Sequence, residues 1–292
     1  MNILSVDLEE WFNFIGDDAV PPYDEWAKLP SRVEESTEQL MEILDGIRIT
    51  FFVLGFVAER NPHLIKRIAS FGHEIASHGC RHEFVFDLGP KYFRSDISRS
   101  KAILEDLVGK PCLGYRAPAF SIRQQDTWAL EIIREEGFLY DSSVFPGFRS
   151  FGGIPGAFPY PHIIRAESGD LLEIPISTTR TCGLTTAFCG GGFFRIIPSF
   201  FIHKKIQLIN CDNKPAVAYI HPRDIDAKQP RLKLKPLNRI MYYYGLKNSK
   251  EKFNKLVKSF VWGSCAELLY DVGLMSSLPR VLLQDVAKPS LG

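Results

Sequence analysis

The stretch Ser77-His78-Gly79-Cys80-Arg81-His82 decides the fold of this chain, together with Ser5-Val6-Asp7-Leu8-Glu9-Glu10 near the N-terminus. Each stretch includes or follows an apolar run typical of a buried strand. His78 and His82 stand four residues apart, and Gly79 between them permits a sharp turn. Imidazoles at this spacing converge on one metal ion when a carboxylate supplies a third ligand. The two stretches therefore predict a catalytic divalent-metal centre and favour hydrolytic chemistry.

Short apolar runs alternate with amphipathic segments along most of the chain. Helical spacing is found at 32–44, 62–71, 92–107 and 126–136. The predicted strands are 3–7, 49–54, 74–77, one ending at 115–118, 138–141, 172–176 and 217–220. Alternation of this kind indicates an α/β fold with a parallel sheet and helices outside, and about seven units indicate a barrel.

Chemically reactive side chains stand where the predicted strands end. They are Asp7, His78, Arg116, Asp141 and His221. In α/β barrels the catalytic residues lie at the C-terminal ends of the strands, so we expect these five to gather at one mouth of the barrel.

The chemistry of these residues suggests a role for each. Asp7 and Glu9 alternate by two and share one face if the strand continues, so we expect one to bind metal and the other to act as general base. Arg116, in a segment stiffened by proline, can keep the base ionised and oriented. Asp141 can orient a partner or cap the next segment. His221 is suited to protonating a leaving amine or alkoxide.

The composition limits the classes of partner and the cellular location that we expect for this protein. A net charge of +1 argues against nucleic-acid binding. No apolar run approaches the roughly 20 residues that span a bilayer, and the chain opens on a strand rather than on a basic and apolar leader. The 6 cysteines form no CxxC pair, which favours reduced thiols over a disulfide framework or a zinc–cysteine site. We therefore expect a cytoplasmic protein.

Three regions depart from the alternating pattern. Residues 142–170, rich in Gly, Pro and Phe, are expected to form an insertion over the mouth of the site. The run 190–192 is interpreted as a tight turn, because no Lys-Ser/Thr pair follows it as in phosphate loops. Residues 226–292 are expected to form a basic helical extension packed on a catalytic barrel of residues 1–225. Its cations form either a solvated surface or a patch for anionic lipid or a nucleotide-sugar phosphate.

Five segments, in order, resemble the motifs of the polysaccharide deacetylases of carbohydrate esterase family 4, which include the nodulation-factor deacetylases. The segments are Ser5–Phe12, Ser77–His82, Tyr115–Pro118, Tyr140–Ser143 and Tyr219–Pro222. Further segments at 173–177, 190–195 and 229–232 resemble a branch found in exopolysaccharide and O-antigen biosynthesis loci. The resemblance runs nearly end to end and implies a distorted (β/α)7-type barrel with a C-terminal extension.

The resemblance also implies catalytic roles for the residues that match its motifs. Asp7 would be the catalytic base, with Arg116 as its tether. The backbone amide of Ala119 would help to form an oxyanion hole. His221 would be the general acid. Asp141, in the fourth motif, is also expected to be a catalytic residue.

The same resemblance implies a metal site, with Zn²⁺ as the expected ion. His78 and His82 would be two ligands. Most of the family has two adjacent aspartates in the first motif, whereas Leu8 follows the first aspartate here. The metal carboxylate is then Glu9 by strand geometry, or Glu10 if the motif is aligned on the tryptophan that follows. The residues expected to bind substrate are Trp11, Tyr115 and Phe120.

The implied activity is removal of the N-acetyl group of an acetylated sugar, with release of acetate, during surface polysaccharide biosynthesis. The substrate would be nucleotide-linked, lipid-linked or oligomeric, and the basic C-terminal region would supply any peripheral membrane contact. Two alternatives stay open. A cyclic-amide hydrolase of this fold would act on a ureide and not on acetylated sugars. A non-catalytic sugar-binding subunit would bind metal without hydrolysis.

Overall fold

The computed structural model describes residues 1–181 and 183–286. Most of its strands belong to one sheet: β1 Asn2–Leu8, β2 Thr50–Val53, β3 Glu74–Ser77, β4 Gly114–Tyr115, β5 Tyr140–Asp141, β6 His162–Ala166, β7 Gly169–Glu173, β10 Val217–Ile220, β11 Trp262–Gly263 and β12 Arg280–Leu282. The order is β10-β1-β2-β3-β4-β5-β7-β6-β12, and β11 also pairs with β1. All pairs except β6–β7 are parallel. A separate antiparallel hairpin is formed by β8 Thr178–Thr181 and β9 Leu184–Ala187.

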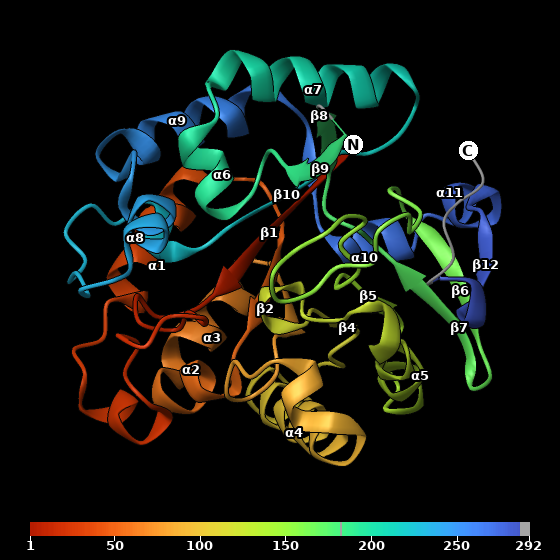
Figure 1. Cartoon of the computed structure of the whole chain (residues 1–292), viewed down its shortest axis with the longest axis horizontal. Helices are drawn as coiled ribbons and strands as arrows, with labels where there is room; N and C mark the ends of the chain where they lie inside the picture. Colours follow the sequence, from red (N-terminus) through yellow and green to blue (C-terminus); the bar gives the residue numbers. More distant parts are fainter. Residues whose placement is uncertain (182, 287–292) are drawn as a thin grey trace.

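Helices surround the sheet (Figure 1). They are α1 Val33–Ile43, α2 Gly55–Arg60, α3 Pro62–Ser70, α4 Val85–Val108, α5 Trp128–Glu135, α6 Gly191–Ile196, α7 Ser199–Cys211, α8 Pro236–Tyr243, α9 Leu246–Ser259, α10 Cys265–Leu269 and α11 Val272–Ser277. α4 starts earlier than its spacing predicts, because it continues across a kink where Gly89 has a φ of 63° and Pro90 follows. Within the described residues, no helix has the length and apolar character needed to cross a bilayer.

The predicted α/β class is confirmed, and β3 and β10 have the predicted bounds. In the described chain the ladder does not close into a ring, since β10 and β12 are its ends. The space between β7 and β10 is bridged by loop residues. Ser177 N donates to Val217 O at 3.0 Å, and Tyr219 N donates to Cys189 O at 3.2 Å. These contacts give the sheet the curvature of a distorted barrel.

The C-terminal region differs from the expected purely helical extension. α8, α9, α10 and α11 lie there, but β11 and β12 join the main sheet beside β1 and β6. Sequence periodicity missed these strands because they are only 2 and 3 residues long. Residues 287–292 and Cys182 lie outside the described residues. The other cysteines, described as free thiols, are Cys80, Cys112, Cys189, Cys211 and Cys265.

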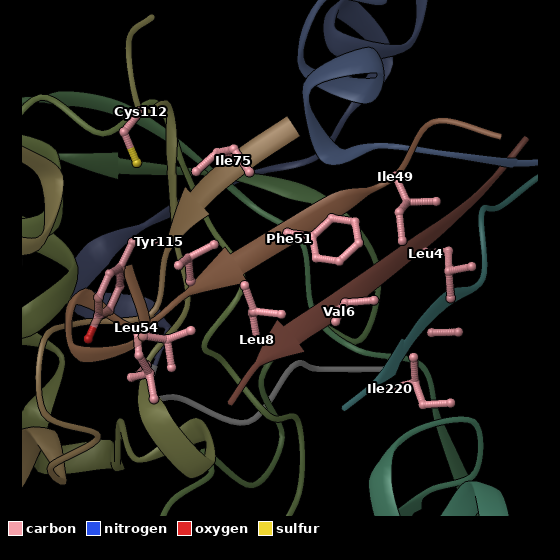
Figure 2. Packing of buried hydrophobic residues seen from close by; sticks show 14 of the residues in the cluster. Leu4, Val6, Leu8, Ile49, Phe51, Leu54, Ile75, Cys112, Tyr115 and Ile220 are labelled. Atoms are coloured by element: carbon pink, nitrogen blue, oxygen red, sulfur yellow. The ribbon is translucent and has the colours of Figure 1, made fainter. Parts of the chain in front are cut away.

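Alternation along the buried strands sorts side chains between two cores. Leu4, Val6 and Leu8 of β1 pack in the larger core, with Phe51 of the neighbouring strand (Figure 2). Ile3 belongs to the second core, inside the curved sheet. Because side chains alternate along a strand, Ser5 and Asp7 point to the same inner side as Ile3.

A close contact across the inner face yields the first prediction. A Cβ on Gly114 would lie 1.8 Å from Cζ of Tyr140, a fully buried ring on the next strand. Gly114→Ala should therefore lower the free energy of unfolding by about 1–3 kcal/mol, measured by urea denaturation. Gly273→Ala is the matched control, because its nearest neighbour would be Asp271 Oδ1 at an ordinary 3.5 Å. Equal transition midpoints for Gly114→Ala and the native protein would contradict this packing.

Candidate metal centre and active site

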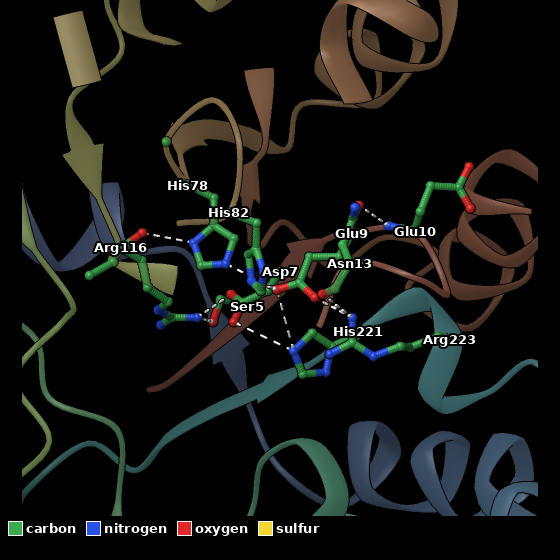
Figure 3. A network of polar contacts seen from close by, with 12 residues as sticks. Ser5, Asp7, Glu9, Glu10, Asn13, His78, His82, Arg116, His221 and Arg223 are labelled. Carbon is green, nitrogen blue, oxygen red and sulfur yellow. Dashed lines mark hydrogen bonds and ion pairs between the residues drawn. The ribbon is translucent and has the colours of Figure 1, made fainter. Parts of the chain in front are cut away.

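The C-terminal ends of four strands bring the main polar residues together (Figure 3). Asp7 is the sixth residue of β1, and His78, Arg116 and His221 directly follow β3, β4 and β10. The parallel pairing of these strands with their neighbours places these ends at the same edge of the sheet. Residues separated by more than two hundred positions thus share one site.

Three ligand atoms converge on one point. Nε2 of His78 and Nε2 of His82 each lie 3.0 Å from Oε1 of Glu9, and all three side chains are buried. The ligand atoms of this group lie within 4.8 Å of one another. Two imidazoles and one carboxylate are a usual three-ligand set for a catalytic cation.

The hydrogen bonding of the histidines fits a bound cation. Nδ1 of His78 donates to the carbonyl oxygen of Arg116 at 2.7 Å, so the neutral ring presents Nε2 as an acceptor toward Glu9. Neither ring nitrogen of His82 has a hydrogen-bond partner among the described residues, although both are buried. Burial lowers the pKa of His82, which favours its neutral form. Nε2 of His78 and Nε2 of His82 facing one carboxylate oxygen are the arrangement that a divalent cation would satisfy.

Arg223 neutralises the carboxylate of Glu9, the acid that faces the two histidines. Arg223 is buried, and its Nη1 contacts Oε2 of Glu9. Burial by itself would raise the pKa of Glu9, but Arg223 and the neighbouring histidines hold that pKa well below its usual range. Glu9 is therefore ionised, with one oxygen on Arg223 and the other facing the two histidines. The sequence motifs did not predict this pairing of Arg223 with Glu9.

Asp7 and Arg116 form a buried ion pair. Nη1 of Arg116 donates to Oδ1 of Asp7 at 2.6 Å and to Ser5 Oγ at 2.8 Å. Nη2 donates to Ser142 Oγ at 2.8 Å, and Nε to Ser142 O at 3.3 Å. The guanidinium is 0% exposed, and its bonds on both sides leave it one orientation. Asp7 is thereby fixed beside the convergence point of the metal ligands.

His221 faces both carboxylates. Its Nε2 lies 3.9 Å from Oδ2 of Asp7 and 3.7 Å from Oε1 of Glu9. Its Nδ1 donates to Asp224 Oδ2 at 2.8 Å, and Asp224 also accepts from the His221 backbone N–H at 2.9 Å. Burial would raise the pKa of Asp224, but Arg195 and His221 lower it. Sequence reasoning missed Asp224, although an acid three residues after His221 matches a capping-box spacing.

These groups open onto a cavity of about 350 Å³. Ala119 and Phe120 line it and both have positive φ, 54° and 55°. This strained turn after Pro118 presents the Ala119 backbone at the cavity wall. Residues 148–151, from the segment expected over the mouth, and Thr185 and Thr186 of β9 also line the cavity.

Glu10 points away from the histidines (Figure 3). Its carboxylate accepts the backbone N–H of Arg32 at 3.1 Å and the hydroxyl of Ser31, at the start of α1. The ligand-forming group contains Glu9 and not Glu10. Of the two alternatives for the metal carboxylate, the geometry favours Glu9, because alternation along the extended chain turns Glu10 to the opposite side.

Two residues expected to bind substrate lie instead in the core. Tyr115 is 1% exposed and packs edge-on against Phe93, since it alternates with Arg116 and faces the helices. Trp11 is buried against Phe12, and its indole N–H donates to Pro30 O at 2.9 Å. Neither lines the cavity, whereas Phe120 does. The expectation for Tyr115 and Trp11 is therefore not supported by their placement.

Asp141 lies behind the site rather than in it. Its oxygens accept from Ser143 Oγ at 2.6 Å and Ser143 N at 3.0 Å, and Ser143 Oγ in turn accepts from Ala117 N at 2.8 Å. Burial and the neighbouring Asp141 raise the pKa of Glu173 well above its usual range, so this buried carboxyl pair shares a proton. Asp141 thus accepts a backbone N–H of the segment that follows it and, through Ser143, positions Ala117 next to Arg116; it does not line the cavity.

The loop that carries both histidines also contacts Asp96 of α4, a half-buried carboxyl. Its Oδ2 accepts from Cys80 N at 2.9 Å, and burial raises its pKa from 3.8 to about 6. The unfolded carboxyl ionises near pH 4 while the folded one keeps its proton to about pH 6, so stability from this group falls as pH rises through that window. Between about pH 4 and pH 6, the free energy of unfolding of the native protein should therefore fall by at most about 3 kcal/mol relative to that of Asp96→Asn.

This loss is measured by urea unfolding at a series of pH values with EDTA present, so that metal binding does not add its own pH dependence. A stability difference between the two proteins that stays constant from pH 4 to pH 7 would contradict the assignment of a protonated Asp96.

Comparison with known proteins agrees with this geometry. Residues 22–138 match the polysaccharide deacetylase family model, and residues 142–270 match a domain of unknown function, DUF3473. A peptidoglycan deacetylase-like protein of Gibberella zeae is 34% identical over 36% of this chain and 32% of its own length. A peptidoglycan-N-acetylglucosamine deacetylase of Bacillus cereus is 33% identical over 28% and 39%. The chain thus spans well under half of either curated relative.

A crystal structure of a candidate polysaccharide deacetylase from Mycobacterium smegmatis has the same fold, with a TM-score of 0.60 at 22% identity over 96% of this chain and 92% of that one. Residues 22–138 thus form a polysaccharide deacetylase domain, in agreement with the resemblance to carbohydrate esterase family 4.

Proposed function

We propose that this protein is a metal-dependent N-deacetylase, which hydrolyses the acetamide of an N-acetylated sugar and releases acetate. The observation that carries the proposal is the convergence of Glu9, His78 and His82 beside the Asp7–Arg116 pair. Both curated relatives are named as deacetylases or deacetylase-like proteins, which favours this chemistry.

The residues around the cavity divide the reaction between them. A divalent cation held by Glu9, His78 and His82 would supply a Lewis acid for the acetamide carbonyl and lower the pKa of water. Asp7, held in place by Arg116, takes the proton from the attacking water. The Ala119 amide N–H would donate to the developing oxyanion.

The proton for the leaving amine comes from His221. Its Nδ1 is held by Asp224, which fixes the ring orientation and stabilises the imidazolium, so Nε2 is the nitrogen that donates. That nitrogen lies 3.9 Å from Oδ2 of Asp7 and 3.7 Å from Oε1 of Glu9, within ion-pair range. The base and the acid thus lie beside each other in the cavity. Asp7 would accept a proton from the attacking water, and His221 would donate a proton to the leaving amine.

The finer parts of the assignment are proposals as well. We infer Zn²⁺ as the ion, because two imidazoles and one carboxylate suit it. The place in exopolysaccharide or O-antigen synthesis rests on the resemblance of segments 173–177, 190–195 and 229–232 to that branch. The cytoplasmic location inferred from the cysteine pattern stays a prediction.

We also propose that α8 contacts an anionic membrane surface. Leu237, Ile240 and Tyr244 form one stripe, spaced by three and four residues, and are 73%, 53% and 60% exposed. Between Asp226 and Glu251 the chain has seven Lys or Arg and no acidic residue, although Lys235 is paired with Asp18. Basic residues near an apolar stripe suit an anionic bilayer, at roughly 1 kcal/mol each. The other side of α8 lines the cavity with Asn238, Met241 and Tyr242, so a lipid-linked sugar would meet the site there.

The metal proposal predicts that the purified protein holds about one divalent ion per chain, and that the double variant His78→Ala/His82→Ala loses it. Elemental analysis measures the ion, and acetate release from chitotetraose measures turnover. His221→Ala is the matched variant, because it should keep the ion and lower turnover by about 10²–10⁴-fold.

Loss of turnover without loss of metal in the double variant would contradict the ligand assignment. Normal turnover in His221→Ala would remove its role as acid. Full metal content with no hydrolysis of any acetylated sugar would favour a binding subunit, and hydrolysis of a ureide instead would favour the cyclic-amide alternative.

The membrane proposal predicts that the native protein co-sediments with vesicles of phosphatidylcholine and phosphatidylglycerol and that Leu237→Glu/Ile240→Glu weakens this at least about tenfold. Phe200→Glu is the control, because Phe200 is 74% exposed on α7, away from α8. Equal losses in both variants, or binding to pure phosphatidylcholine that matches the anionic vesicles, would contradict a specific role for α8.

A further inference from the structure

Charged side chains around the cavity are matched one to one, with a single exception. Asp7 is paired with Arg116, Glu9 with Arg223, and Asp224 with Arg195 at 2.9 Å. These three acids are the ionisable carboxylates that line the cavity within the described residues. Arg149 also lines the cavity, and no carboxylate on its wall remains for it.

The guanidinium of Arg149 is held in place by aromatic rings, and its side chain donates no hydrogen bond within the described residues. Its Cζ lies 5.3 Å from the ring centre of Phe120 and 5.1 Å from that of Phe145. Its backbone N–H donates to Gly152 O at 3.2 Å, which closes a tight turn. Contacts with two aromatic rings stabilise a guanidinium and orient its plane, but they leave the N–H groups free.

The unused donors of Arg149 carry a cost. Its Nη1 is buried and has no hydrogen-bond partner among the described residues, nor does Arg149 form an ion pair with any of them. A buried donor on a charged group that lacks a partner is destabilising, and such groups are rare in native proteins unless a ligand satisfies them. A polar partner from the substrate would remove that cost.

We propose that Arg149 is the centre of an anion subsite, which takes a carboxylate or phosphate carried by the acetylated sugar. This inference rests on the proposed deacetylase function and adds a substrate class to it: acidic N-acetylated sugars, in preference to neutral ones. A guanidinium recognises carboxylate and phosphate oxygens through paired N–H donors, so either anion suits the site.

The position of Arg149 separates the anion from the reacting bond. The ring of Tyr219 lies 5.5 Å from that of His221, and the Phe120 ring lies 5.2 Å from Tyr219. Arg149 is the next group along this row. Its guanidinium therefore contacts a substituent at a distance from the acetamide rather than the acetamide itself, and acts on selectivity rather than on the chemical step.

The test compares three probes that share one sugar: N-acetylglucosamine, N-acetylmuramic acid and UDP-N-acetylglucosamine. Their binding is measured by calorimetry to EDTA-treated protein, so that a metal does not bind the anions. The native protein should prefer at least one acidic probe, and Arg149→Gln should reduce that preference by about 10–100-fold. The probe that loses its advantage distinguishes carboxylate from phosphate. Arg149→Lys should keep part of the preference, since it retains the charge without the paired donors.

Arg165→Gln is the matched control, because it removes the same charge from an exposed position in β6, outside the cavity wall. Circular dichroism and thermal unfolding verify that each variant is folded. Equal affinity for all three probes, or a preference that Arg149→Gln leaves intact, would overturn the subsite.

Acetate release from chitotetraose by the metal-loaded native protein tests the proposed function separately. Anion preference that depends on Arg149 without any turnover would support the subsite and remove the deacetylase. Turnover with a preference that does not depend on Arg149 would retain the deacetylase and remove the subsite.

Discussion

The site depends on one buried interaction, the ion pair between Arg116 and Asp7. Taking a guanidinium out of water costs several kcal/mol unless its donors are satisfied and its charge is paired. Here Asp7, Ser5 and Ser142 satisfy them, from segments that follow or belong to β1 and β5. The plane also lies 4.0 Å from the ring centre of Phe52 in β2. One side chain thus ties the end of β4 to β1, to β2 and to the segment that follows β5.

The same principle of local neutralisation extends across the cavity. Glu9 forms an ion pair with Arg223, and Asp224 forms one with Arg195. Each acid is buried, and each arginine keeps its partner ionised where burial alone would favour the protonated form. The proposed chemistry needs ionised carboxylates as a metal ligand and as a support for an imidazolium, and Arg223 and Arg195 lower the pKa of the two acids in these roles. Against this balance, the unpaired Arg149 is what indicates a charged ligand.

Supporting layers hold this arrangement from behind. Asp141 and Glu173 share a proton and position Ser143, which bonds the segment after Arg116. Asp96 does the equivalent for the histidine loop through the backbone of Cys80. Both supports use carboxyl groups whose pKa is raised by their removal from water, in contrast to the ionised acids in the site. Arg81 and Arg116 offset this rise in pKa only in part, because neither forms an ion pair with Asp96 or Glu173 among the described residues.

The sequence alone determined the class of fold and the residues that meet at the strand ends. Apolar runs alternating with helical periodicity require a parallel sheet, and parallel strands bring their C-terminal ends to one edge. Asp7, His78, Arg116 and His221 were predictable for that reason. The tertiary structure decided which side each neighbouring residue faces. It turned Glu10 toward α1 and Tyr115 into the helix-facing core, because adjacent residues of an extended strand point in opposite directions. It also paired Glu9 with Arg223, more than two hundred residues away, and left Nη1 of Arg149 without a hydrogen-bond partner among the described residues. Local pattern carries no information about such long-range charge pairing, since it depends on how loops outside the regular elements fold over the sheet.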